Sequence, residues 1–103
     1  MFTFVETPHF SRIVGDYLSD EELATFELAL ASNPDLGVLI PASGGLRKVR
    51  WRYSGRGTRG GVRIIYYVKR LDALIWLLSI YAKTEREDLD HETLLKLRKE
   101  IDG

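Results

Sequence analysis

The hydrophobic pattern changes its period at Pro34, and this change most restricts how the chain can fold. Between residues 10 and 17, and again between 23 and 30, apolar side chains recur at the spacing of one helix face. Between residues 46 and 53, Lys and Arg instead alternate with apolar groups, so the two kinds of side chain point to opposite faces of a strand. The chain therefore predicts two helices followed by a sheet.

Capping residues predict where the first elements begin. Residues 2–5 are expected to form a short strand, and Thr7 caps a first helix with Pro8 at its first position. Ser19 and Glu22, three residues apart, form a capping box for the second helix. These signals place a strand and a helix pair ahead of the sheet.

The rest of the chain is expected to form the sheet and a short helical C-terminal segment. Three antiparallel strands are expected at residues 46–53, 62–68 and 73–81, with a glycine-rich loop at 54–61. A second capping box, Thr84 with Glu87, and a cap at Asp90 predict one or two short C-terminal helices. We therefore expect one α+β domain over residues 1–103, with the helix pair packed on one face of the antiparallel sheet and cations on the other.

Basic residues are concentrated in the centre of a chain that is neutral overall. Nine of the fifteen Lys and Arg residues lie between Arg47 and Arg70, and no Asp or Glu lies between Asp35 and Asp72. Aromatic residues interleave with them, a combination that suits a polyphosphate partner. The alternative is a solvated basic strand pair, although a solvated face normally mixes both signs. Because side chains of a strand alternate between its two faces, Lys48, Arg50 and Arg52 lie on the same face. Arg63 can lie opposite them on the adjacent strand.

Several classes of site find no support in the sequence. There is no cysteine, and His9 and His91 lie far apart without a carboxylate cluster, so each is expected to be a surface or capping residue. The run SGRGTRGG lacks the spacing of a phosphate-binding loop. The N-terminus lacks the pattern of a signal peptide, and the longest apolar stretch, residues 73–82, is about half a membrane span. We expect a cytoplasmic protein with no metal, cofactor or membrane partner.

A site made only of cations still permits one reaction on RNA. The ribose 2′-hydroxyl can attack the adjacent phosphate if a base removes its proton and cations neutralise the phosphorane. Lysine can act as a base where neighbouring cations lower its pKa, and arginine can hold the developing charge. Lys48 beside Arg50, Arg52 and Arg63 allows this division of labour without requiring it.

Three basic motifs in order, GGLRKVR, RGGVRIIYYV and LSIYAKTE, resemble the HigB/RelE family of bacterial toxins over nearly the whole chain. The resemblance implies a compact RelE-like microdomain, ribosome-dependent cleavage of mRNA without metal, and a cognate antitoxin. By position, Lys48 and Arg50 match the paired cations of the family's second strand, and Arg63 matches the arginine that opens the third. Ala82-Lys83 matches the turn after the last strand.

The chain also departs from the family. Thr84 stands where well-known relatives have a further arginine, and Asp90 where some have a tyrosine. Tyr81 is a candidate to replace that tyrosine in stacking, or else a core residue, and Lys83 is a candidate acid or an ordinary charge on a turn.

The sequence thus predicts an mRNA interferase of a toxin–antitoxin pair. Lys48, Arg50, Arg63 and Lys83 are the expected catalytic residues. RNA contacts are expected from Arg47, Arg52, Arg56, Arg59 and Tyr81. The expected partners are the ribosome, mRNA and an antitoxin with a helix-turn-helix domain. The alternative is a non-catalytic nucleic-acid-binding module that uses the same basic face.

Overall fold

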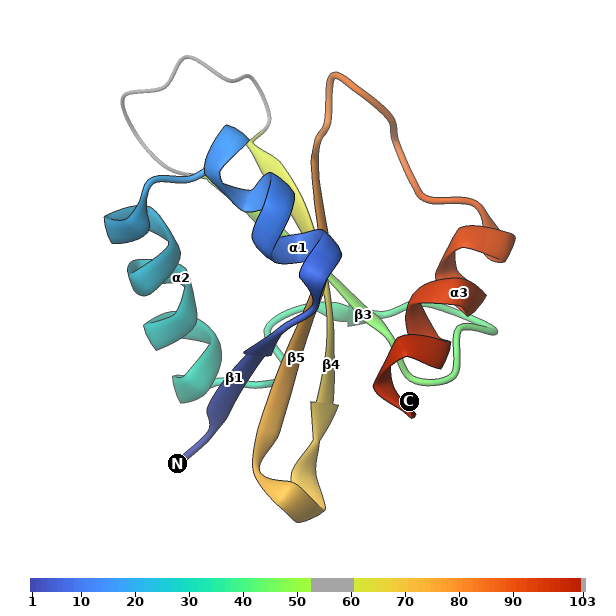
Figure 1. Ribbon diagram of the computed structural model, residues 1–103, viewed down its shortest axis with the longest axis horizontal. Coiled ribbons are helices and arrows are strands. Elements are labelled where there is room, and N and C mark those ends of the chain that lie inside the picture. The colour runs from blue at the N-terminus through green and yellow to red at the C-terminus, as the bar shows by residue number, and fades with distance from the viewer. Residues whose placement is uncertain (53–60, 103) are drawn as a thin grey trace.

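A five-stranded sheet forms the centre of the computed structural model, with helices against both of its faces (Figure 1). The structure describes residues 1–52 and 61–102, so the expectations for Arg56, Arg59 and most of the glycine-rich loop lie outside the described residues. The strands are β1 (Thr3–Glu6), β2 (Val38–Leu39), β3 (Arg47–Trp51), β4 (Val62–Lys69) and β5 (Leu74–Ala82). The helices are α1 (Pro8–Ile13), α2 (Asp20–Ser32) and α3 (His91–Ile101), with single 3-10 turns at Val14–Asp16 and Arg70–Asp72.

The strand order is β1-β5-β4-β3-β2, antiparallel throughout except for β1, which runs parallel to β5. The expected central strand is confirmed, because β5 lies between β1 and β4 and is almost continuously buried from Ile75 onward. A tight turn joins β4 to β5, and Ala73 closes it with a left-handed φ of 54°.

Strand β2 was not expected from the sequence, and contacts far along the chain create it. The Gly37 amide donates to the Tyr66 hydroxyl (2.8 Å), which in turn donates to the Pro34 carbonyl (2.8 Å). A Cβ on Gly37 would lie 2.7 Å from the Lys48 carbonyl oxygen, so only glycine lets the chain approach β3 so closely. This anchoring brings Val38 and Leu39 alongside β3.

The helix pair covers one face of the sheet, as expected. Both predicted caps are present: the Thr7 hydroxyl accepts from the Phe10 amide (3.2 Å), and Ser19 and Glu22 form the reciprocal capping box. Phe10, Phe26 and Leu30 are 0% exposed and pack on the β3, β4 and β5 side chains of this face. Each such burial contributes about 2 kcal/mol, so this layer fixes the sheet from which the site projects.

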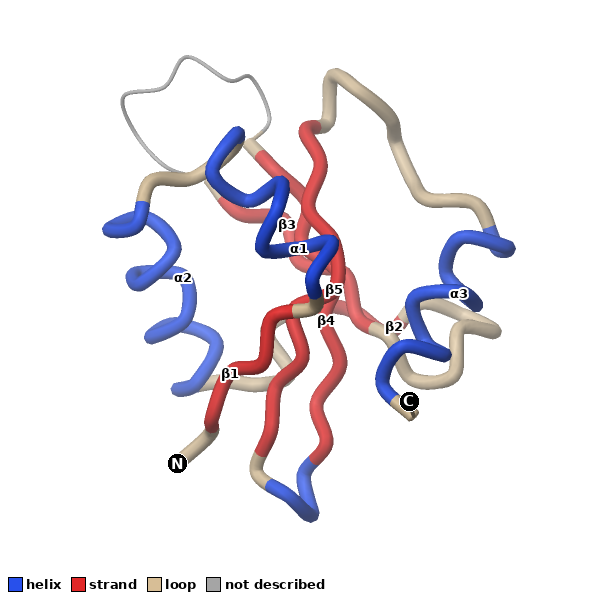
Figure 2. Tube along the Cα trace, viewed as in Figure 1, coloured by secondary structure: helices blue, strands red, loops and turns tan. Residues whose placement is uncertain are grey.

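The opposite face is covered in part by α3, which corrects the expectation that cations alone occupy it. Leu94, Leu97 and Ile101 of α3 pack with Leu46, Ile65 and Leu78 of the sheet region. Figures 1 and 2 show α1 and α2 on one side of the strands and α3 on the other. The expected cap at Asp90 is confirmed, because its carboxylate accepts from the Thr93 amide (2.8 Å). The cations are therefore confined to the end of this face that α3 leaves uncovered.

The capping box expected at Thr84 and Glu87 is wrong, because residues 83–90 contain a turn and a bend and no helix. Glu85 takes the capping role instead: its carboxylate accepts from the Ala82 amide (2.8 Å) and from the Tyr17 hydroxyl (2.6 Å). A contact with a residue of the first helical layer therefore decides the course of this segment, which local spacing could not reveal.

Candidate nucleic-acid interface

Arg50, Arg63 and Tyr81 form one row across three adjacent strands. Arg50 pairs with Arg63 in the β3–β4 register, and Arg63 pairs with Tyr81 in the β4–β5 register. All three lie on the α3 face, since their strand neighbours Val49, Ile64 and Ile80 face the helix pair. Side chains directly opposite have Cβ atoms about 5 Å apart, so the two guanidinium groups belong to one site. The expectation that Arg63 lies opposite the β3 cations is confirmed.

Arg63 differs from expectation in its exposure. We expected its side chain to lie on the face away from the helix pair, which it does, yet it is only 2% exposed, while Arg50 is exposed. Arg63 lies between Arg50 of β3 and Tyr81 of β5 in the sheet, so a buried cation stands beside an exposed one. A buried guanidinium held in this way is a preorganised donor for an anion bound above it.

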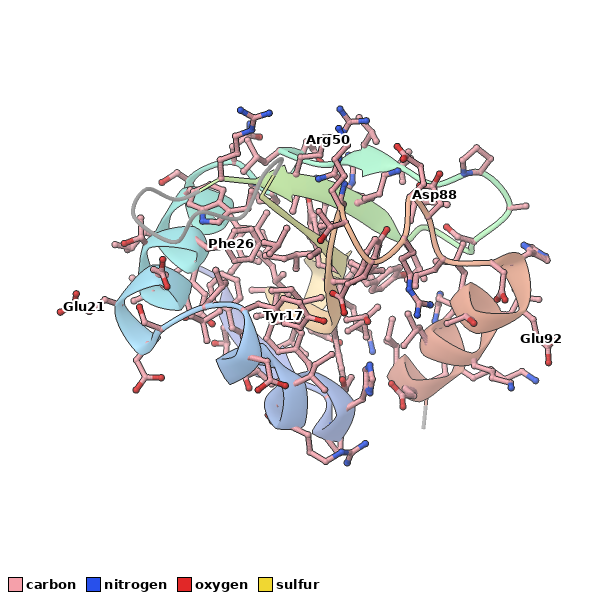
Figure 3. The ribbon with its side chains drawn as sticks, turned by 90° about the horizontal axis from the view of Figure 1, so that it is seen from above. Tyr17, Glu21, Phe26, Arg50, Asp88 and Glu92 are labelled. Carbon is pink, nitrogen blue, oxygen red and sulfur yellow. The ribbon has the colours of Figure 1, made fainter. Side chains whose placement is uncertain are left out.

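Lys48 lies two residues before Arg50 on the same face, and its ammonium group contacts the Asp88 carboxylate. The basic segment therefore contains no carboxylate in its sequence, but carboxylates from other parts of the chain contact it in the folded protein. Asp35 likewise binds Arg47 (3.2 Å) and Arg70. Figure 3 shows Arg50 and Asp88 on the same side of the molecule, from β3 and from the segment between β5 and α3. This segment brings an acid to the cationic row, and sequence analysis did not identify it.

The remaining expected RNA contacts fall in different places. Arg47 faces the helix-pair side of β3, where its guanidinium also donates to the Gly37 carbonyl (2.7 Å). Arg52 is exposed just past the end of β3, and Lys83 is exposed just past the end of β5. The structure thus brings Lys48, Arg50 and Arg63 together and puts Arg47 on the other face.

Tyr81 is 4% exposed and belongs to the core under α3, yet it also borders the cationic row. Its hydroxyl has no hydrogen-bond partner among the described residues. Burial, and after it the nearby Asp88 carboxylate, raises the pKa of Tyr81 to about 12, so the phenol stays protonated at physiological pH. The charges of Arg63 and Arg86 act on the same hydroxyl in the opposite sense. Arg86 is thus a further cation near the row, and no periodic signal pointed to it.

A cavity of about 350 Å³ opens beside Lys48, between β2 and the start of α3. Its walls are mostly apolar, and its polar groups come from Lys48, Asp88 and Tyr81. Elsewhere in residues 1–52 and 61–102, no group of three or more histidines and carboxylates is placed to hold a metal ion. Nor is any described helix long and apolar enough to cross a membrane.

Comparison with known proteins supports the architecture. No protein-family model matches the sequence. Among solved structures, the E. coli toxin RelE, determined in the free state as a variant with two arginines replaced by alanine, superposes with a TM-score of 0.59 at 14% sequence identity. The match covers 94% of this chain and 96% of the RelE chain. Because the likeness extends over nearly all of both chains, the protein has a RelE-like α+β fold.

Proposed function

We propose that this protein is the toxin of a toxin–antitoxin pair, a ribosome-dependent endoribonuclease that cleaves mRNA in the ribosomal A site. The observation that carries the proposal is the row of Arg50 and Arg63, with Lys48 beside it, on one open end of a RelE-like sheet. Cations in direct opposition repel each other, so an anion bound between them gains from both. The phosphodiester of RNA is the anion that this site suits.

In the proposed reaction the ribose 2′-hydroxyl attacks the adjacent phosphorus, and the 5′-oxygen of the next nucleotide leaves. Arg50 and Arg63 hold the phosphate and stabilise the charge of the phosphorane, the role in which buried, oriented donors are most effective. Lys48, as a neutral amine after its own proton has passed to water, takes the proton of the 2′-hydroxyl. Lys83, exposed at the end of β5, donates a proton to the leaving oxygen.

The contact between Lys48 and Asp88 gives a reason for dependence on the ribosome. In the free protein the Lys48 side chain is held by the Asp88 carboxylate, so it is not placed against a 2′-hydroxyl. Substrate presented in a fixed geometry by the ribosome would supply the binding energy that separates this pair. Naked RNA would therefore be bound but cut poorly.

An antitoxin with a helix-turn-helix domain is the proposed partner that keeps the site inactive in the cell. The basic row favours an acidic partner segment, which would speed association, and apolar anchors would supply most of the affinity. The exposed side chains of Val38 and Leu39 on edge strand β2 lie beside Lys48 and would serve as one such anchor.

One observation favours a second candidate, a nucleic-acid-binding module without catalysis. If the Asp88 carboxylate stays on Lys48 when RNA binds, the site lacks its base and retains only phosphate binding. The two candidates differ in a single measurable property, which is the appearance of new RNA ends.

Induced expression in bacteria, followed by growth curves and primer extension on a translated message, tests the proposal. Wild-type protein should arrest growth and produce ribosome-dependent cuts. Arg50→Ala should abolish both growth arrest and cleavage, because it removes a cation that holds the phosphate. Arg50 is exposed, so its loss should leave the fold intact. Arg12→Ala is the matched control: it removes another exposed arginine, from α1 on the other side of the sheet, and should behave as wild type. Unimpaired growth and uncut message with wild-type protein would contradict the enzyme and leave the binding module.

A further inference from the structure

The cavity beside Lys48 has mostly apolar walls, which the proposed cleavage chemistry does not use. Its walls include Leu39 and Pro41 on one side and Leu89 and Leu94 on the other. Leu39 is 57% exposed, and Val38 beside it is 64% exposed, so the wall on the β2 side presents apolar surface to water. Apolar surface that lines a concavity is a common sign of a ligand-binding site.

The polar groups of the cavity come from few residues. Lys48 and Asp88 both line it and contact each other, with the Asp88 side chain 61% exposed and that of Lys48 only 19%. The ring of Tyr81 forms part of the wall, and its protonated hydroxyl has no partner among the described residues.

We propose that this cavity is a nucleobase-binding subsite and that Asp88 reads the base. The inference rests on the proposed function, since it assumes that a phosphate is bound at Arg50 and Arg63. Substrate bound there separates Asp88 from Lys48, and the freed carboxylate becomes an acceptor beside the cavity. The base joined to that phosphate then lies between the apolar walls, as bases do in protein pockets with apolar and aromatic sides.

The volume and the acceptor together define the ligand. About 350 Å³ is at the small end of ligand cavities, which suits one base and not a longer ligand. A carboxylate only accepts hydrogen bonds, so it favours a base edge that carries N–H donors. Guanine presents two adjacent donors, N1–H and N2–H, to a carboxylate in bidentate geometry. Uracil presents one N–H between two carbonyl oxygens that repel the carboxylate, so the subsite should prefer guanine to uracil.

Calorimetric titration of the purified full chain with GMP, UMP and ribose 5-phosphate tests the subsite. We expect GMP to bind about 10-fold or more tightly than UMP, from one bidentate contact, and both to bind more tightly than ribose 5-phosphate. Asp88→Asn should bring GMP and UMP to within about 2-fold of each other, because the amide no longer matches the guanine edge. Glu87→Gln is the matched control. It removes the same charge from the neighbouring exposed position, outside the cavity lining, and should keep the preference for GMP.

A second variant tests the apolar walls of the cavity without disturbing the hydrophobic core. Leu39→Ala truncates an exposed side chain, and it should weaken GMP and UMP to a similar extent while leaving ribose 5-phosphate unchanged.

The outcomes separate this inference from the proposed function. Equal affinity for GMP, UMP and ribose 5-phosphate would overturn the subsite while leaving the phosphate site in place. Failure of all three ligands, together with failure of inorganic phosphate, would remove the phosphate site on which the proposed function depends. Retention of the GMP preference in Asp88→Asn would overturn the role of Asp88.

Discussion

Arg63 lies directly opposite Arg50 in the β3–β4 register, and only Arg50 of the two is exposed. Like charges in this position destabilise a sheet by about 0.2–1 kcal/mol, so the pair costs stability in the free protein. A residue that costs stability and holds an anion should show opposite effects on folding and on activity when it is replaced.

Arg50→Thr should therefore raise the stability of the protein and reduce its cleavage of mRNA. We expect the free energy of unfolding to rise by about 0.5 kcal/mol, because repulsion is removed and threonine suits a strand. Urea denaturation of wild type and variant measures this change, and primer extension should show cleavage reduced by about 10²-fold. A variant that is both less stable and fully active would show that the pair has neither role.

Lys48→Ala and Arg63→Ala should each reduce cleavage of translated message by about 10²-fold or more, because the first removes the proposed base and the second removes a charge that stabilises the phosphorane. Arg63 is buried, so its alanine variant also leaves a void and needs a check of folding by thermal denaturation. Arg63→Lys keeps a cation with less geometric match and should show an intermediate rate. Cleavage at the wild-type rate by folded Lys48→Ala and Arg63→Ala would refute the site assignment.

RNA affinity should depend strongly on salt, falling by about 10³-fold between 50 and 200 mM if about six phosphates are contacted. Arg52 is exposed beyond β3, so Arg52→Ala should reduce the slope of log K against log salt by about 1. Arg47 is held by Asp35 and the Gly37 carbonyl, so Arg47→Ala should leave the slope unchanged and lower stability by about 1 kcal/mol. Filter binding over a salt series measures the slopes, and a flat wild-type profile would contradict a nucleic-acid surface.

The hydrogen bond from Tyr17 to Glu85 should make stability depend on pH at both ends of the range. Burial and then this bond raise the pKa of Tyr17 from 10.0 to about 12, so the contribution is complete below pH 10 and is lost as pH rises through 12. The same bond is the main cause of the lowered pKa of Glu85, usually 4.5, so the contribution is lost as pH falls through that lowered value.

Tyr17→Phe should therefore destabilise the protein by about 0.5–1 kcal/mol between pH 5 and 10, after allowance for solvent screening, and by less outside that window. Urea denaturation across a pH series measures the difference. Tyr67→Phe is the control, because it keeps the ring over which the Arg98 guanidinium lies at 4.6 Å. A difference that does not change with pH would show that the hydrogen bond is not its source.

Tyr66→Phe should destabilise the protein by about 2 kcal/mol and loosen β2. The Tyr66 hydroxyl satisfies both the Gly37 amide and the Pro34 carbonyl, and phenylalanine would leave two backbone groups without partners. Hydrogen exchange should show faster exchange at residues 37–39 in the variant than in Tyr67→Phe. Equal protection in the two variants would mean that β2 is held by other contacts.

The sequence by itself determined the three α-helices, all of the described strands except β2, and the faces of the long strands. The caps at Thr7, Ser19 and Asp90 depend on groups three residues apart, so they were correctly predicted without tertiary information. The alternation in β3 and β4 likewise placed Arg63 on the same face as the β3 cations, because period 2 leaves few registers that bury the apolar face, and the structure made Arg50 its direct partner.

The tertiary structure alone decided which other residues contact and enclose the basic residues of the site. Asp88 is 40 positions from Lys48 and Tyr66 is 29 positions from Gly37, and no local pattern encodes such contacts. The packing of α3 on the sheet limited the open cationic surface and formed the cavity wall, while the segment after β5 supplied Asp88 and Arg86. Charge spacing in the sequence therefore identified which residues could bind an anion. Burial and pairing, which depend on the whole fold, decided which of them are placed to do so.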